Sequence, residues 1–92
     1  SAAPPPEPDI EGFTAHLEAE IGLPASALDQ YTDWGQELCF DLYHAEDDAD
    51  ARAIINEAGF YMMDLGWEDY EVDFLMSAVS TYLCPDVRFN VP

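Results

Sequence analysis

The sequence predicts an all-α domain: a small bundle of about four helices, closed by one disulfide between Cys39 and Cys84, with a Pro-rich N-terminal tail. Apolar residues make up 49% of the 92 residues and aromatic residues 13%, which is enough for a core despite a formal net charge of −18. Apolar residues also recur at three- and four-residue steps along most of the chain. The two cysteines lie far apart and form no C-x-x-C pair, which favours a structural disulfide.

Residues 1–8 are predicted to be a flexible tail. They hold four of the seven prolines, and the fixed φ of proline favours extended polyproline geometry over helix. Residues 9–92 are predicted to form a single helical domain, because a chain of this length has room for one core.

Two helices are predicted in the first half of the domain. Asp9 is placed to cap the first helix, and Gly22-Leu23-Pro24 ends it. Ser26 and Asp29 resemble a capping box with Asp in place of Glu, so they predict the start of the second helix. The apolar residues of the first helix are Ile10, Phe13, Leu17 and Ile21. Those of the second are Leu28, Tyr31, Trp34 or Gly35, Leu38, Cys39 and Leu42.

The second half predicts two more helices. Asp47 and Asp50 form a cap-like pair before the third helix, which Gly59 could end early. After a break at residues 64–67, acidic residues occupy a first turn, where a helix dipole favours negative charge. The third helix has the apolar residues Ala51, Ile54 or Ile55, Ala58, Met62 and Leu65. The fourth has Tyr70 or Val72, Phe74, Leu75, Ala78, Val79 and Tyr82.

The fourth helix is expected to carry Cys84 in its last turn, because Pro85 stops the helix there. Cys39 lies on the apolar face of the second helix, so a disulfide would tie the second helix to the end of the fourth. Residues 87–91 are predicted to form a short extended tail, because they include β-branched and aromatic residues without a helical period. Two buried free thiols in a cytosolic protein remain the alternative to a disulfide.

The start of the chain and its two cysteines indicate where the protein is located. The chain begins Ser1-Ala2-Ala3 without an initiator Met, and no apolar run is long enough for a signal peptide or a transmembrane segment. We therefore expect a secreted or cell-envelope protein from which a signal peptide has been removed, since disulfides persist in oxidising compartments.

Two short motifs carry a family resemblance: Gly-x-x-x-Cys from Gly35 to Cys39, and the sequence Tyr82-Leu83-Cys84-Pro85. With these motifs the chain resembles a family of secreted actinobacterial (mycobacterial) domains called domain of unknown function 732. The resemblance implies a cleaved signal or lipoprotein leader, a small helical body, and two cysteines flanking helices that end in a Tyr-Cys-Pro motif. The family has no established activity, so the resemblance implies no catalytic residue.

The charge restricts the partners that we expect. Twenty acidic residues face two arginines, so the chain should repel nucleic acid and anionic lipid and attract basic proteins and divalent cations. One acidic cluster surrounds two aromatic residues and predicts an interaction surface. This predicted surface consists of Trp67, Glu68, Asp69, Tyr70, Glu71 and Asp73. Alternatively, its carboxylates complement a helix dipole and both aromatic side chains pack in the core.

Residues 46–57 contain the best candidate for a calcium site. Glu46, Asp48, Asp50 and Glu57 occupy the acidic positions one, three, five and twelve of an EF-hand loop. Ala51 stands where the loop needs glycine, and the same stretch has helical periodicity, so only weak and diffuse calcium association is expected. His16 and His44 are predicted to be surface residues, and Met62 and Met63 to be core. No cofactor is expected.

No nucleophile elbow, H-E-x-x-H motif or phosphate-binding loop occurs, so the chain is predicted not to be an enzyme. The leading hypothesis is a secreted or cell-envelope-associated protein-interaction module whose acidic surface binds a basic protein or envelope component. One alternative is a carrier of a small molecule or of a divalent metal such as calcium. Another is an acidic cytosolic inhibitor that imitates nucleic acid. The oligomeric state stays open.

Overall fold

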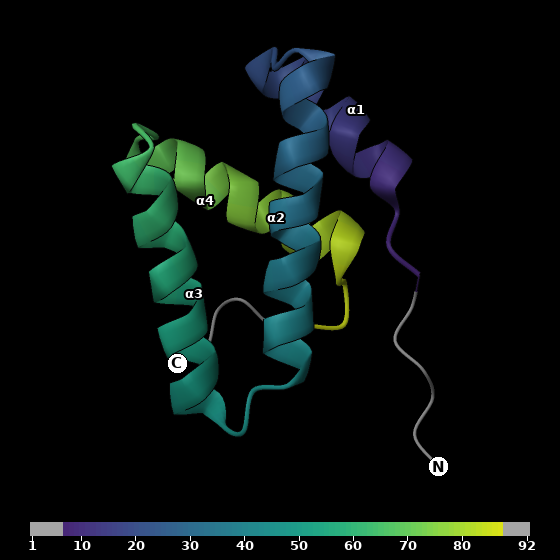
Figure 1. Ribbon diagram of the computed structural model, residues 1–92. Helices are drawn as coiled ribbons and strands as arrows, with labels where there is room; N and C mark the ends of the chain where they lie inside the picture. Colours follow the sequence, from purple (N-terminus) through teal and green to yellow (C-terminus); the bar gives the residue numbers. More distant parts are fainter. Residues whose placement is uncertain (1–6, 88–92) are drawn as a thin grey trace.

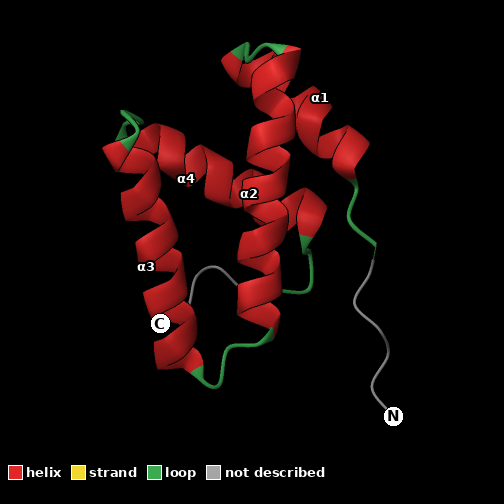
Figure 2. Ribbon diagram, viewed as in Figure 1, coloured by secondary structure: helices red, strands yellow, loops and turns green. Residues whose placement is uncertain are grey.

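A computed structural model describes residues 7–87, which form four α-helices followed by a short π-helix (Figures 1 and 2). The elements are α1 (Ile10–Ile21), α2 (Ala25–Tyr43), α3 (Asp48–Asp64), α4 (Asp69–Ala78) and η1 (Val79–Leu83). Residues 7–87 contain no strand. The predicted all-α, four-helix fold is confirmed. Most of the predicted N-terminal tail and of the predicted extended C-terminal segment lies outside the described residues.

Side-chain caps begin two of the helices, as predicted. The Asp9 carboxylate accepts a hydrogen bond from the backbone N–H of Gly12 at 2.9 Å. The Asp47 carboxylate accepts from the N–H of Asp50 at 2.8 Å, and Asp50 in turn accepts from the N–H of Glu46 at 3.0 Å. These bonds satisfy N–H groups that have no partner inside a helix.

One boundary prediction is wrong, and one boundary that the sequence left open is decided by the structure. The N-cap of α2 is Pro24, without a side-chain cap, so Ser26 and Asp29 do not form a capping box. Helix α3 also continues past Gly59 to Asp64. Glycine inside a helix costs about 1 kcal/mol. Helix α3 continues nevertheless, because its next turn buries Met62 in the core with 1% of its surface exposed.

The core forms where α1, α2, α4 and η1 meet, and α3 contributes Met62 to it. Its fully buried side chains are Phe13, Leu17, Met62, Leu75, Val79 and Cys84. Gly35 allows α2 and η1 to approach closely, because a Cβ atom at this position would lie 2.6 Å from Cδ1 of Leu83. Any larger residue in place of this glycine of the Gly-x-x-x-Cys motif would force the Leu83 side chain to move.

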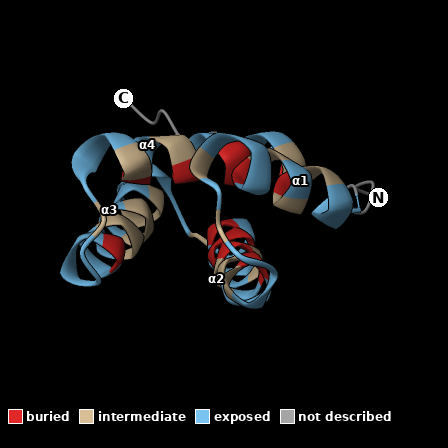
Figure 3. Ribbon diagram, turned by 90° about the horizontal axis from the view of Figure 1, so that it is seen from above, coloured by how far each residue is buried: buried red, intermediate tan, exposed pale blue. Residues whose placement is uncertain are grey.

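Helix α3 is the least buried of the four helices. It packs on α2 and α4, whereas no contact joins it to α1 or η1 among the described elements. It lies beside α2 in Figure 1, and Figure 3 shows less buried surface on α3 than on α2. Met62 is the one fully buried residue among the 17 of α3. One side of the α2–α3 hairpin therefore stays open.

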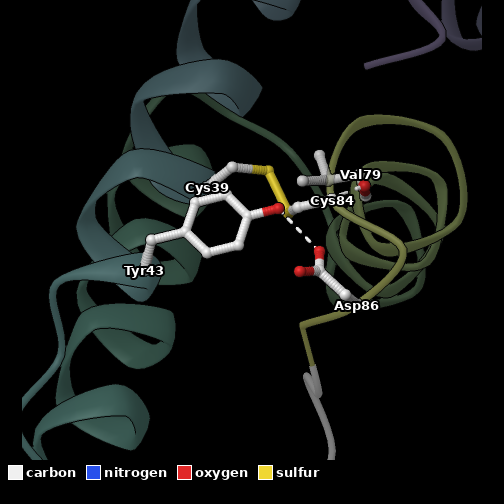
Figure 4. Close-up of a disulfide and its surroundings, with 5 residues drawn as sticks. All are labelled: Cys39, Tyr43, Val79, Cys84 and Asp86. Carbon is white, nitrogen blue, oxygen red and sulfur yellow. Dashed lines mark hydrogen bonds between the residues drawn. A yellow bond between two sulfur atoms is a disulfide. The ribbon is translucent and has the colours of Figure 1, made fainter. Parts of the chain in front are cut away.

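The disulfide joins α2 to the end of η1. The Cα atoms of Cys39 and Cys84 are 5.9 Å apart, and both side chains are buried (Figure 4). Cys84 follows the π-helix as its C-cap instead of lying in the last turn of an α-helix, since its N–H donates to the carbonyl of Val79, five residues earlier, at 3.1 Å. The predicted pairing of Cys39 with Cys84 is confirmed. The π-helix before Cys84 was not predicted from the sequence.

Tyr43 lies next to this disulfide and holds the C-terminal segment. Its hydroxyl donates a hydrogen bond to Oδ1 of Asp86 at 2.6 Å (Figure 4). Burial, then the hydrogen bond to Asp86 and the negative charge of that carboxylate, raise the pKa of Tyr43 from 10.0 to about 12. The protonated phenol is thus the form that the fold favours.

We expect the Tyr43–Asp86 bond to add a pH dependence to stability. Because the folded-state pKa of Tyr43 is raised, the contribution is complete below about pH 10 and is lost as the pH rises towards about 12. In Tyr43→Phe this contribution is absent, so the gap between the melting temperatures of wild type and variant should narrow above about pH 10. Tyr70→Phe, at an exposed tyrosine, serves as the control. A constant gap across this pH range would contradict the expectation.

Candidate interaction surface

A groove runs between α2 and α3 on the open side of the hairpin and encloses about 490 Å³. Its floor is apolar and comes from both helices. The floor residues are Trp34, Leu38, Ile54, Ala58 and Met62. A volume of this size falls in the range of about 300–1,000 Å³ that is typical of ligand pockets.

The rim of the groove on α2 is acidic. Asp33, Glu37 and Asp41 line the groove and are exposed. They follow one another at four-residue steps, so they lie on one face of α2. At 1.5 Å per residue the three carboxylates extend over about 12 Å of the helix. Together they present a row of negative charge beside apolar side chains.

The rim on α3 is mixed in character. Glu57, Tyr61 and Leu65 line the groove at the same four-residue steps. Tyr61 is 54% exposed and Leu65 is 53% exposed, so both present apolar surface to solvent at the edge of the groove. Because α2 and α3 are joined by a short loop and run in opposite directions (Figure 1), Glu57 lies towards the loop and Leu65 towards the other end.

The end of the hairpin away from this loop is closed by an aromatic pair. The rings of Tyr31 and Trp67 meet edge to face with centroids 5.1 Å apart. Nε1 of Trp67 also donates a hydrogen bond to the Tyr31 hydroxyl at 3.0 Å. This pair fixes the start of α2 to the turn between α3 and α4, which holds the two walls of the groove in place.

The structure divides the predicted surface into two parts. Trp67 is half-buried against the core, and Oε1 of Glu71 accepts a hydrogen bond from the N–H of Glu68 at 3.0 Å, which caps α4. Tyr70 is 70% exposed, so the alternative that it packs in the core is wrong. Its neighbours Asp69 and Asp73 are exposed as well. Tyr70 and these two carboxylates form an exposed patch on α4, called here the α4 patch.

The structure does not assemble the predicted calcium site. Asp48, Asp50 and Glu57 lie in α3, where residues two positions apart point in different directions. Asp50 moreover accepts the hydrogen bond from the N–H of Glu46. Within residues 7–87, no three His, Cys, Asp or Glu side chains gather as a group that could hold a metal ion. The acidic residues with EF-hand spacing thus lie on and before a continuous helix instead of in a loop, and weak, diffuse calcium association stays a prediction.

Two further predictions need correction. His16 is not a free surface residue: it is half-buried and stacks on Phe74, with ring centroids 5.0 Å apart. Met63 is 42% exposed, whereas Met62 is buried as predicted. His44 is exposed, and its Nδ1 lies 2.9 Å from the carbonyl oxygen of Phe40.

Sequence reasoning missed the groove between α2 and α3. The available signal was the four-residue spacing of Asp33, Glu37 and Asp41 next to the apolar face of α2. In a chain with 20 acidic residues, such spacing is common on any exposed helix face. Only the position of α3 shows that this row borders a groove.

The fold and this surface define a disulfide-closed, four-helix domain with an acidic-rimmed apolar groove. The sequence profile of a family described as "Protein of unknown function (DUF732)" matches residues 8–86, and the chain belongs to this family. The match extends beyond the segment from Gly35 to Pro85 that carries the two motifs. Comparisons with curated proteins and with solved structures gave no match. Within residues 7–87, none of the helices combines the length and apolar character that crossing a membrane requires.

Proposed function

We propose that this domain is a non-catalytic protein-interaction module, secreted or associated with the cell envelope, that binds a basic protein partner. The groove between α2 and α3 is the observation that carries the proposal. It places exposed apolar side chains directly beside a row of carboxylates. Apolar contacts supply binding energy, and complementary charge directs the approach of the partner.

The proposed location is supported by the disulfide between Cys39 and Cys84. Such bonds are rare in reducing compartments and persist outside them. A formal net charge of −18 supports a basic partner, because the field of the whole domain attracts cations over a distance of about 8 Å at physiological salt.

The two alternative functions are supported less well. A volume of about 490 Å³ suits a small-molecule carrier. However, the rim residues of the groove are exposed to water, whereas small-ligand pockets enclose most of their ligand. The cytosolic inhibitor required two free thiols, and the structure pairs them.

Selection from a random peptide library displayed on phage tests the proposal. The oxidised domain should enrich peptides that are both basic and apolar, and their binding should weaken as salt is raised, because the charge contacts are exposed. Polyglutamate serves as the control, since peptides that bind it equally well respond to charge alone. If no peptides are enriched, or if they are no more basic than the starting library, the proposal is wrong.

A further inference from the structure

We propose that the groove between α2 and α3 receives an amphipathic helix of the basic partner, so that three helices pack together on the open side of the hairpin. This inference rests on the proposed function and adds to it the structural form and the contact residues of the partner. It follows from the packing of α3, from the length of the two rims and from the distribution of charge between them.

The packing of α3 leaves a place for another helix. Met62 is the one fully buried residue of α3, while Ile54 and Ala58 are only half-buried although they form the groove floor. Side chains of a third helix fit between the rows of side chains on two neighbouring helices. Laying the apolar face of a helix into such a groove is a recurring mode of peptide recognition.

The two rims match in length. The row from Asp33 to Asp41 on α2 extends over about 12 Å, and so does the row from Glu57 on α3 to Leu65, the C-cap of α3. Both rows line the groove. The two rows are staggered along the antiparallel hairpin, because Asp41 lies near the loop end of α2 and Leu65 just beyond the far end of α3. A helix lying along the groove therefore needs at least two turns, or roughly eight residues, to contact both rows. Its apolar side chains would recur at three- and four-residue steps to form one face.

The charges determine which edge of that helix is basic. The edge that faces α2 should carry Lys or Arg at four-residue steps, because it lies along the carboxylates of Asp33, Glu37 and Asp41. The other edge meets Tyr61 and Leu65 and is therefore mainly apolar, with Glu57 at the end that lies towards the loop. A second copy of this chain does not fit as the occupant, because the domain has a formal net charge of −18 and repels itself.

A designed peptide provides the probe. It has one face of leucines, a row of lysines along one edge and neutral helix-forming residues elsewhere, and it carries a fluorescent label for anisotropy measurements. The control peptide has the same composition in scrambled order, so that its charge is kept and its amphipathic face is lost. The oxidised domain should bind the amphipathic peptide at least tenfold more tightly than the scrambled peptide. A factor of about ten is the affinity that one well-packed anchor residue contributes.

Matched variants locate the binding site. Tyr61→Ala truncates an exposed tyrosine of the groove, and Tyr70→Ala truncates an exposed tyrosine of the α4 patch. Tyr61→Ala should weaken binding about tenfold, the usual loss for a central aromatic contact, and Tyr70→Ala should leave it unchanged. Glu37→Gln should weaken binding about twofold to fivefold, as for an exposed ion pair, and Glu18→Gln on α1 should not.

The outcomes separate the inference from the proposed function. Equal binding of both peptides, or equal effects of Tyr61→Ala and Tyr70→Ala, would overturn the helix-in-groove inference. A loss confined to Tyr70→Ala would also overturn it and move the site to the α4 patch, leaving a basic partner in place. If peptide selection yields basic sequences that do not compete with the designed peptide, the inference again fails while the proposed function stands.

Discussion

Replacing Cys39 and Cys84 by alanine is expected to lower the free energy of unfolding by about 4 kcal/mol. The bond closes a loop with a sequence separation of 45 residues, and in the chain-entropy model a loop of this length restricts the unfolded chain by about that amount. A domain of this size has a net stability of roughly 5–15 kcal/mol, so the loss is a large fraction of the total.

The melting temperature of the double alanine variant should fall by roughly 15–30 °C, since each kcal/mol corresponds to about 4–8 °C in a small domain. Alanine is preferred to serine here because both sites are buried and a hydroxyl would need a hydrogen-bond partner. Reductant should lower the melting temperature of the wild type by a similar amount and leave the variant unchanged. If wild type with two free thiols, verified by mass spectrometry, melts like the oxidised protein, the bond does not stabilise the fold.

Phe13→Ala is expected to destabilise the domain by about 3–5 kcal/mol, the usual cost of removing a phenyl ring from a packed core. The side chain of Phe13 is 0% exposed. Its Cζ atom lies 3.8 Å from the position that a Cβ atom would take at Gly35, so the ring packs between α1 and α2. A cavity at this point cannot close easily, because the disulfide holds α2 and η1 together on the same side of the core.

Phe60→Ala is the matched control for Phe13→Ala. Phe60 also lies in a helix, but its side chain is 65% exposed, so the same change should alter stability by no more than about 0.5 kcal/mol. The change from Phe to Ala raises helix propensity by the same amount at both sites, so the difference in free energy of unfolding between the two variants reports the burial of Phe13. Urea unfolding of the oxidised proteins measures it. Equal midpoints would show that Phe13 does not lie in the core.

Much of the fold could be predicted from the sequence because the signals are local. The carboxylates of Asp9 and Asp47 bond to N–H groups three residues away, so residue type and spacing are sufficient to predict a cap. The apolar steps through Phe13 and Leu17 predict a buried helix face in the same way. The pairing of the cysteines followed from their number, since the chain contains two.

Local signals were insufficient where a distant contact outweighs a local preference, and one cap-like spacing was misleading. Gly59 would weaken an isolated helix, yet it lies inside α3 near Val72 of α4. His16 would be an ordinary surface residue on its own helix, but Phe74 of α4 stacks on it. Ser26 and Asp29 have the spacing of a cap, but α2 begins with Pro24 as its N-cap, so both residues already lie inside the helix.

The sequence by itself determined the helices, two of their caps, the covalent closure and the excess of negative charge, because each depends on residue type and short spacing. The tertiary structure alone decided which apolar residues stay uncovered. Periodicity shows that Trp34, Ile54 and Leu65 lie on apolar faces, but not whether another helix covers those faces. The position of α3, held by α4 and by the Tyr31–Trp67 pair at one end of the hairpin, leaves that side of α2 and α3 as an open groove.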